Sequence, residues 1–499
     1  MQMITWGRSL AAGLIAGLVS LAFMFWTRFY FEGPLIPELL AAKLFASTPI
    51  EVFSFFVRRL GLASKYVAFG TIVIGYLVFL LALGGLLLHG LRRLGVVFIS
   101  SSAVVWIVSL GIFFLLGQPF PQTSYLFSAA ILLFSSLIFG GALTALGLWF
   151  TPLPSLGKQG LEGRRAAIKM LSPALGLLLS GGLVALARAV WAQGGILFNR
   201  IKGLSWEVTP NDVFYTISKN VFDPRINPKN WSLKVTGLVD KELSLNLKDI
   251  KAMPAISQHT TLICISNEVG GDLVGNTLWK GVPLAEVLKR AGVKPGASEL
   301  ILRAYDGYSD SIPLAKGLEA GTTLAYEMNR APLPDNHGRP LRLLVPGIYG
   351  MKNVKWITGV EVADYDYKGY WERRGWSDEA VIKTMSRIDV PQRGQRLKPG
   401  ESYLAGIAFA GVRGVKRVQV SIDGGKSWSK ATVKKALSPF SWALWAWPWN
   451  VAKSLRGRSV TVKVRAMDGK GQLQTDRVTA PLPDGASGLH QVRVKVKKS

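Results

Sequence analysis

Residues 260–271 read TTLICISNEVGG, an apolar run that leads directly into a polar loop ending in two glycines. The apolar run predicts a buried β-strand, and the residues after it predict a loop. Cys264, the only cysteine of the chain, lies where the strand passes into the loop. A lone cysteine is most often inert and buried, but such a junction is a place where sites are built. Three hypotheses stay open for Cys264: a structural residue, a nucleophile with His259 or His337 as its base, or a soft metal ligand.

The composition around this stretch is uneven. The 499 residues include 59 Lys+Arg against 31 Asp+Glu, for a net charge of +28, yet the mean hydropathy is positive at +0.27. Residues 1–195 contain 13 Lys+Arg and 4 Glu, whereas the remainder contains 46 Lys+Arg and 27 Asp+Glu. The chain therefore divides into an apolar part and a basic part. One cysteine excludes an intramolecular disulfide, a CxxC motif and a four-cysteine iron–sulfur site.

The apolar part predicts a transmembrane region over residues 1–195, with membrane lipid as its partner. A helix needs about 20 apolar residues to span a bilayer, and no charged residue occurs between Arg93 and Lys158. The sequence GQPFP at 117–121 divides that stretch into two helices. Five α-helical spans are predicted in all, at about 9–29, 66–90, 95–117, 125–150 and 168–192.

Loop charge orients this multi-pass anchor in the cell membrane. Arg92 and Arg93 lie in one short loop, and four basic residues lie between 158 and 169. Both loops are expected in the cytoplasm, which places residues 30–65 outside as amphipathic helices and the basic part on the extracytoplasmic, periplasmic side. The sequence GRRAAIK at 163–169 resembles a twin-arginine export signal, and plain positive-inside anchoring is the alternative.

The basic part predicts two folded regions after a linker at 196–211. Residues 212–390 mix expected strands at 231–239, 300–304 and 341–345 with a helix at 283–291, which predicts an α+β domain. Residues 393–499 are all β, with strands at 415–422 and 460–466 and a glycine turn at 423–425 that predicts a hairpin. About 100 residues of short strands are typical of an immunoglobulin-like sandwich. The basic tail at 493–498 alternates as an edge strand would.

Three segments in this order carry a resemblance to a known family. The first is the strand, Cys264 and the loop with Asn267. The second is LAYEMN at 324–329, then PLPDNHGRPLR at 332–342 and VPG at 345–347. The third is the 421–428 hairpin with the Trp-rich 441–449. Residues 212–390 resemble the molybdopterin-binding domain of the sulfite oxidase family, and residues 393–499 resemble the domain that follows it there and dimerises in soluble relatives. The whole layout is similar to membrane-anchored bacterial molybdopterin-dependent oxidoreductases.

The resemblance implies a Mo-molybdopterin cofactor, with one molybdenum per chain ligated by the Cys264 thiolate and by two dithiolene sulfurs of the pterin. A thiolate is the soft, deprotonated donor that such a metal requires. No haem or iron–sulfur cluster is expected, because His89 is the only histidine in the predicted spans. The residues implied to hold the cofactor are Asn220, Asp306, Ser311, His337, Arg342, Asn353 and Lys355.

The departures from the family concern the substrate pocket. Glu268 follows Asn267 where the family has basic residues, Lys219 precedes Asn220 where it has an arginine, and Trp376 stands where it has the active-site tyrosine. Cys264, Lys219 and Trp376 are therefore the catalytic candidates. A carboxylate in place of a cation disfavours sulfite. Two-electron or oxygen-atom transfer on another small molecule, such as a sulfoxide or N-oxide, is expected. Further pocket candidates are Tyr305, Tyr308 and Tyr326.

Two alternatives stay open for the function. One is sulfite oxidase or nitrate reductase-like activity, and the other is a non-catalytic binding module on the same fold. An enzyme of this kind would exchange electrons with a separate carrier, either a cytochrome or a quinone-linked protein. A homodimer through residues 393–499 is a further expectation. Nucleic acid is not an expected partner, because no basic–aromatic recognition motif is present.

Overall fold

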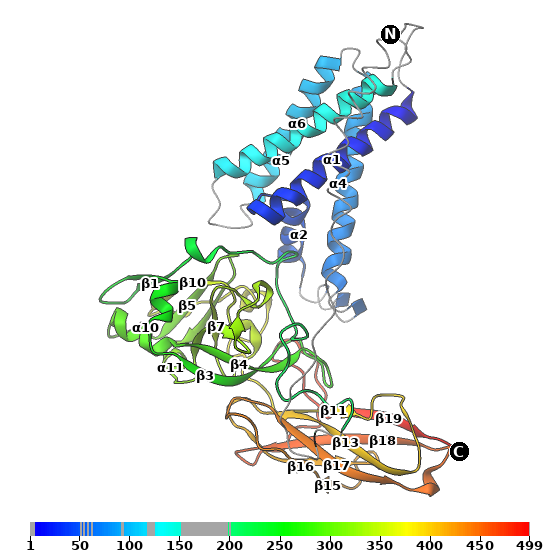
Figure 1. Ribbon diagram of the computed structural model, residues 1–499, viewed down its shortest axis with the longest axis vertical. Coiled ribbons are helices and arrows are strands. Elements are labelled where there is room, and N and C mark those ends of the chain that lie inside the picture. The colour runs from blue at the N-terminus through cyan, green and yellow to red at the C-terminus, as the bar shows by residue number, and fades with distance from the viewer. Residues whose placement is uncertain are drawn as a thin grey trace. The chain divides into compact units, whose positions relative to one another are not determined.

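The chain divides into two units in the computed structural model, which describes residues 5–49, 52, 55–56, 59–60, 63–90, 94–116, 125–150, 198 and 201–498. One unit comprises Met1–Ala189 with Lys219–Arg225, and the other comprises Val190–Ser218 with Ile226–Ser499. The first holds the long helices and the second holds the sheets (Figure 1). We call them the helical unit and the sheet unit.

Within the described residues, the helical unit contains four helices that are long and apolar enough to cross a membrane. The bounds of these helices agree closely with those of four of the five predicted spans. The agreement arises because each helix occupies a stretch that is almost free of charged residues. The fifth predicted span at 168–192 and the sequence GRRAAIK at 163–169 lie outside the described residues. The four helices are α1 (Trp6–Phe31), α4 (Ala63–Gly90), α5 (Leu94–Leu116) and α6 (Tyr125–Phe150), and the shorter α2 (Ile36–Ser47) packs against α4 and α5.

Small residues bring the apolar helices together. A Cβ atom on Gly13 of α1 would lie 2.6 Å from the Leu81 carbonyl oxygen of α4, and one on Gly84 would lie 2.6 Å from the Gly13 Cα. Only glycine allows two backbones to approach so closely. Between α1 and α6, the buried Ser20 and Ser135 hydroxyls lie 2.8 Å apart and hydrogen-bond. These contacts specify which helix faces meet.

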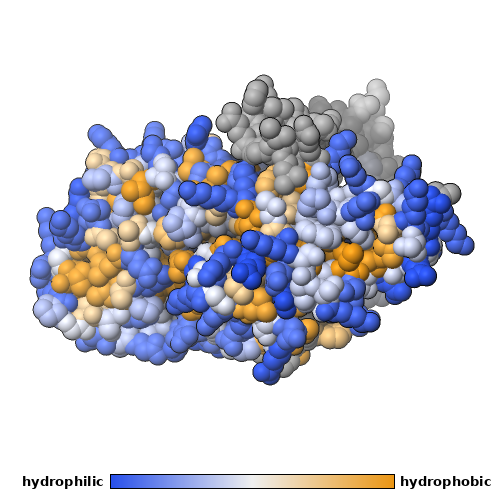
Figure 2. Space-filling view, turned by 90° about the horizontal axis from the view of Figure 1, so that it is seen from below, coloured by the Kyte–Doolittle hydropathy of each residue, from blue (hydrophilic) through white to orange (hydrophobic). Residues whose placement is uncertain are grey.

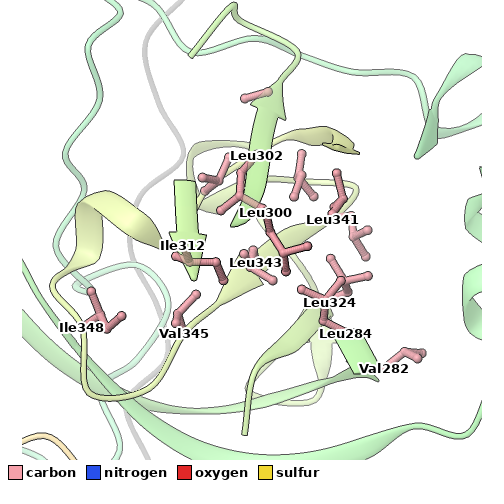
Figure 3. Close-up of a cluster of buried hydrophobic side chains, with 14 of the residues drawn as sticks. Val282, Leu284, Leu300, Leu302, Ile312, Leu324, Leu341, Leu343, Val345 and Ile348 are labelled. Carbon is pink, nitrogen blue, oxygen red and sulfur yellow. The ribbon is translucent and has the colours of Figure 1, made fainter. Parts of the chain in front are cut away.

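The α+β part of the sheet unit contains two sheets around one apolar core. Leu300, Leu302, Leu324 and Leu343 are buried together in this core (Figure 3). The first sheet has the order β2 (Leu243–Asn246), β1 (Ser232–Gly237), β10 (Ile357–Ala363), β5 (Glu299–Ala304) and β6 (Ser309–Pro313). The second has the order β3 (Ile256–Ile263), β4 (Val274–Pro283), β7 (Thr323–Met328) and β8 (Ala331–Pro332), with β9 (Arg342–Leu344) also paired to β7.

The expected elements of this α+β region lie where the sequence placed them. The expected strands at 231–239, 300–304 and 341–345 correspond to β1, β5 and β9. The expected helix corresponds to α10 (Leu284–Ala291), and the shorter helices α9 (Leu247–Lys251) and α11 (Leu314–Gly317) were not predicted.

The C-terminal region consists of two further sheets. Their inner faces meet at a core that includes Val418, Val462, Trp445 and Trp449. The predicted hairpin that begins at residue 415 and ends near residue 428 is present. The basic tail forms a strand, but the expectation of an edge strand is wrong, because the tail pairs with residues 396–397 on one side and with residues 459–463 on the other. One sheet has the order β11 (Met385–Val390), β13 (Gly400–Phe409), β17 (Ala443–Val451) and β16 (Thr432–Val433). The other has the order β12 (Arg396–Leu397), β19 (Gln491–Val496), β18 (Ser459–Asp468), β14 (Val415–Ser421) and β15 (Ser429–Lys430).

The two regions of the sheet unit are continuous in structure. β11 already pairs with β13, so the strands of the C-terminal region begin before residue 393. Phe409, Trp442 and Leu444 of this region belong to the same apolar core as β5 and β7. On the face shown in Figure 2, hydrophilic residues surround smaller apolar areas, as expected for the more highly charged part of the chain.

Candidate active site

The end of β3 places Cys264 at the start of a loop, as predicted. β3 runs antiparallel to β4, and the Cys264 N–H donates to the Leu273 carbonyl oxygen at 2.9 Å. The thiol is half-buried, and its Sγ lies 2.9 Å from the Ser266 Oγ. Burial raises the pKa of the Cys264 thiol, while the hydrogen bonds from Ser266 lower it. A bound metal would have to displace this proton to gain a thiolate ligand.

The loop after Cys264 is held by its own backbone and by the C-terminal region. The Asn267 Oδ1 accepts from the Leu273 N–H at 2.9 Å, which closes the loop. The Gly271 carbonyl oxygen accepts from the Arg387 Nη1 at 2.8 Å. Gly270 has a φ of +81°, and a Cβ there would lie 2.3 Å from the His490 ring. The C-terminal region therefore fixes the loop that presents the thiol.

Two tyrosines that the sequence did not identify lie near Cys264. Gly350 leaves room for the Tyr215 hydroxyl, since a Cβ there would lie 3.0 Å from it and 3.3 Å from the Ile263 carbonyl oxygen. Burial raises the pKa of Tyr215 well above its usual value, and the nearby Cys264 charge adds to the rise. Burial and Cys264 also raise the pKa of Tyr349 to about 12. Both phenols therefore stay protonated at neutral pH beside the thiol.

Arg413 is the cation that acts on Tyr349, and the sequence did not identify it either. Its charge opposes the rise in the Tyr349 pKa. Its Nε donates to the buried Asp468 carboxylate at 2.8 Å, and its Nη2 donates to the Ile382 carbonyl oxygen and the Thr384 hydroxyl. The sequence signal that could have pointed to Arg413 is its place in the glycine-bounded loop GVRG at 411–414, between β13 and β14. Arg413 is thus a cation whose charge Asp468 already balances.

Arg342, a predicted cofactor residue, is a buried cation in an unusual setting. Its Nη1 donates to the His337 carbonyl oxygen and its Nη2 to the Asn353 carbonyl oxygen, both at 3.1 Å, and its guanidinium lies 5.1 Å from the Trp279 ring centre. Burial lowers its pKa to about 10. Its Nε finds no partner in the part of the chain that the structure describes, and no carboxylate there pairs with it. Such a cation suits an anionic ligand.

His337 lies next to Arg342 but is engaged elsewhere. Its Nε2 lies 3.1 Å from the Asn211 carbonyl oxygen and must donate to it, and Phe214 packs edge-on against the ring at 5.5 Å. Burial, helped by the Arg342 charge, lowers the His337 pKa to about 4, so the ring is neutral at pH 7. Among the described residues, the side chain that hydrogen-bonds to the Cys264 thiol is Ser266, and not His337. This favours a metal-ligand role for Cys264 over a nucleophile activated by an imidazole base.

Four other predicted cofactor residues use their polar atoms within the fold. The Asn353 Oδ1 accepts from the Val345 N–H at 2.7 Å, so this side chain shapes the 345–349 turn. The Ser311 hydroxyl donates to the Tyr367 carbonyl oxygen at 2.7 Å. The Asp306 carboxylate accepts from the Tyr308 N–H at 3.0 Å. The half-buried Lys355 donates to the Asn336 carbonyl oxygen at 3.0 Å, close to the His337 loop.

The remaining predicted residues lie in different places. Lys219 and Asn220 belong to the helical unit, where the Lys219 Nζ donates to the Asn220 Oδ1 at 3.0 Å. Their role at the cofactor stays a prediction. Trp376 is half-buried and packs against the core of the sheet unit. Tyr326 is also buried, with Lys251 and Lys280 over its ring.

A buried ionic cluster surrounds the pocket candidate Tyr308. The Lys352 Nζ lies 3.0 Å from the Asp310 Oδ1 and 2.9 Å from the Glu372 Oε1, and all three side chains are at most 3% exposed. The Tyr308 hydroxyl donates to the Asp310 Oδ2 at 2.6 Å. Burial and Glu372 raise the pKa of Asp310 to about 8 against the lowering effect of Lys352. A pKa of about 8 means that Asp310 is mostly protonated at neutral pH.

Comparisons with known proteins identify the two regions of the sheet unit. Residues 220–371 match the model of the oxidoreductase molybdopterin-binding domain, and residues 379–496 match that of the Mo-co oxidoreductase dimerisation domain. The two matched models thus define the class of protein, a molybdopterin-binding oxidoreductase domain followed by its dimerisation domain. The chain belongs to the sulfite oxidase family.

Individual relatives cover different shares of the chain. Mitochondrial sulfite oxidase of Drosophila melanogaster is 31% identical over 58% of this chain, which spans 59% of that protein. The uncharacterized oxidoreductase YuiH of Bacillus subtilis is 36% identical over 29% of this chain and 72% of its own length. The structure of the sulfane dehydrogenase SoxCD from Paracoccus pantotrophus has a TM-score of 0.52 at 22% identity, covering 62% of this chain and 87% of that one.

Proposed function

We propose that this chain is a membrane-anchored molybdenum-cofactor oxidoreductase whose single metal is held by Cys264. The observation that carries the proposal is the position of the only thiol, half-buried at the end of β3 with Tyr215 and Tyr349 beside it. When bound, the cofactor supplies a metal that changes oxidation state by two electrons and can accept or donate an oxygen atom. Burial raises the pKa of the Cys264 thiol, and the hydrogen bonds from Ser266 offset part of that rise, which helps the metal to gain its thiolate ligand.

The residues present fit such a cofactor. Among the described residues, no three His, Cys, Asp or Glu side chains gather as a metal site, so a metal at Cys264 would take its other ligands from the cofactor. Arg342 offers an unpartnered Nε and an unbalanced buried charge to an anionic pterin group. His337 and Lys355 flank it, and the neutral His337 ring keeps its Nδ1 available as an acceptor. Asp306, Ser311 and Asn353 would act by shaping the surrounding turns.

The proposed substrate is a small neutral oxo compound such as a sulfoxide or an N-oxide. Glu268 adds a negative charge to the loop after Cys264, and Asp468 balances the charge of Arg413. An oxyanion such as sulfite therefore meets less positive charge than an unpaired arginine would provide. Tyr215 and Tyr349 can donate hydrogen bonds to a neutral oxygen, because both phenols stay protonated. Sulfite oxidation is the second candidate, since the Drosophila relative is a sulfite oxidase.

The surroundings of the enzyme follow from the other parts of the chain. The four apolar helices support an anchor in the cell membrane, and the loop charges support an extracytoplasmic sheet unit. A separate cytochrome or quinone-linked protein would exchange electrons with the metal. The match of residues 379–496 to a dimerisation domain supports a homodimer.

Metal analysis and a substrate survey test this proposal. The full chain, purified in detergent, should contain one molybdenum and one pterin per chain. With a reduced dye as electron donor it should reduce sulfoxides or N-oxides faster than nitrate, and sulfite with an electron acceptor is the control. Molybdenum-free protein would refute the function. Efficient sulfite oxidation without oxide reduction would instead establish the second candidate.

A further inference from the structure

One short segment of the chain belongs to the helical unit although its neighbours do not. Lys219–Arg225 is part of the helical unit, whereas the chain before it, up to Ser218, and after it, from Ile226, is part of the sheet unit. The match to the molybdopterin-binding domain begins inside this segment, at residue 220. We call residues 219–225 the docked segment. Its contacts with the helices are numerous and of several kinds.

Apolar side chains form the first set of contacts. Val221 is buried in the core of the helical unit. The Phe222 ring meets the rings of Phe25, Phe29 and Phe69 edge-on, with ring centres 6.0, 5.2 and 5.4 Å apart. Edge-to-face packing of this kind is favourable beyond the burial of apolar area. Phe222 therefore occupies a socket built from α1 and α4.

Backbone carbonyl groups of the docked segment form the second set. The Arg28 Nη2 donates to the Phe222 carbonyl oxygen at 3.0 Å, and the Lys65 Nζ donates to the Asn220 carbonyl oxygen at 3.2 Å. Arg225 also lies over the Phe29 ring at 6.0 Å. These bonds fix the path of the main chain, and not only the position of one side chain.

Arg28 is itself held in place by a buried ion pair. Its Nε lies 2.5 Å from the Glu38 Oε2 and its Nη2 lies 3.0 Å from the Glu38 Oε1, and the two side chains are 2% and 7% exposed. A buried ion pair contributes little net stability compared with apolar residues of the same volume. The ion pair fixes an orientation: Glu38 holds the Arg28 guanidinium so that it can also donate to the Phe222 carbonyl oxygen. Arg28 and Glu38 thus act on the docked segment.

We infer that the helical unit is a positioning element of the enzyme as well as an anchor. It holds the docked segment, and with it the backbone of Lys219 and Asn220, in one conformation, on which the proposed cofactor role of these two residues depends. This inference rests on the proposed function for the role of Lys219 and Asn220 at the cofactor. Arg28 and Phe222 are its positioning residues, and neither touches the cofactor or substrate.

Proteolysis and spectroscopy of the full chain test the inference together. Trypsin cuts after Lys219 and Arg225, so docking should protect both sites. Phe222→Ala should make cleavage there about tenfold faster, because the segment detaches more often. Phe31→Ala is the matched control, since Phe31 is a phenylalanine of α1 that is 51% exposed. Phe222→Ala should keep its molybdenum but change the Mo(V) electron paramagnetic resonance spectrum and raise KM, whereas Phe31→Ala should change none of these.

A second pair of variants separates docking from a general loss of folding. Arg28→Gln should behave like Phe222→Ala, and Arg28→Lys should restore protection and the spectrum in part, because lysine can still donate to both Glu38 and the Phe222 carbonyl. Unchanged cleavage in Phe222→Ala would overturn the docking. Faster cleavage with an unchanged spectrum and unchanged KM would overturn the positioning role. A wild-type chain without molybdenum would refute the proposed function, and with it the positioning role, while the cleavage rates would still decide the docking.

Discussion

The Arg342 guanidinium donates to the carbonyl oxygen of His337 at 3.1 Å, and it does so as a buried cation that no carboxylate of the described residues balances. The same guanidinium reaches the carbonyl of Asn353, so it ties the 335–337 turn to the 350–353 turn. An anionic cofactor would complete this arrangement by supplying the missing negative charge.

Replacement of Arg342 should therefore cost the enzyme its cofactor. Arg342→Gln removes the buried positive charge, and we expect the pterin and molybdenum content of the purified full chain to fall at least several-fold. Arg339→Gln is the control, because Arg339 is a half-exposed arginine in the same loop. Pterin can be measured by the fluorescence of its oxidised form. Full cofactor content in Arg342→Gln would contradict the role assigned to this residue.

The buried His337 should make stability depend on pH. Its pKa is about 4 in the folded chain against 6.5 for an ordinary histidine, so the unfolded chain binds a proton here over that range and the folded chain does not. The stability contributed by the neutral ring is present above pH 6.5 and is lost as the pH falls towards 4, by about 3 kcal/mol in total. His337→Gln should flatten the pH dependence of the thermal midpoint in detergent. If the thermal midpoint changed with pH equally in the wild type and in His337→Gln, the role of His337 in this pH dependence would be refuted.

Lys352 should be essential to the stability of the sheet unit. Lys352→Met leaves Asp310 and Glu372 buried beside each other without a cation, which we expect to cost about 3–5 kcal/mol. Lys368→Met is the matched control. Lys368 likewise forms an ion pair, with Asp378, but it is 44% exposed, so its replacement should cost at most about 1 kcal/mol. Thermal unfolding of both variants gives the comparison. Similar thermal midpoints for Lys352→Met and Lys368→Met would contradict this prediction, because they would show that loss of Lys352 leaves no unbalanced charge in the cluster.

Glycine pairs should control the packing of the helical unit. Gly84→Ala puts a methyl group 2.6 Å from the Gly13 Cα, and the backbone must move apart at a cost of about 1–3 kcal/mol. Gly75 lies on the same helix with nothing within 4 Å of an added Cβ, so Gly75→Ala should be neutral or slightly stabilising. The yield of folded protein in membranes and its thermal midpoint report the difference. An equal fall in the thermal midpoint of Gly84→Ala and Gly75→Ala would show that the close approach of Gly84 to Gly13 is not the cause.

Local patterns account for the parts of the fold that the sequence predicted. The long charge-free runs define α1, α4, α5 and α6 to within about three residues, and the apolar run before Cys264 defines the end of β3. The glycine turn at 423–425 defines the β14–β15 hairpin. Each of these signals is complete within about 30 neighbouring residues.

Local sequence patterns could not predict contacts between distant parts of the chain. Arg28 and Phe222 are 194 positions apart, and nothing in the local sequence of either predicts the other. Lys352 reads as a surface charge until Asp310 and Glu372 are brought to it. Tyr215 lies in the long irregular segment 201–227 and Tyr349 in a turn after β9, and their nearness to Cys264 depends on the pairing of sheets. The sequence therefore predicted the thiol at the end of a strand, but not the tyrosines that lie near it.

The sulfur ligands of the metal give the most direct test of the central claim that Cys264 holds molybdenum. X-ray absorption at the molybdenum edge of the purified full chain should show three sulfur neighbours, two from the pterin and one from Cys264. Cofactor retained by Cys264→Ser should show two, with Ser427→Ala as a control that keeps all three. Two sulfur neighbours in the wild-type chain, or three in Cys264→Ser, would contradict the account.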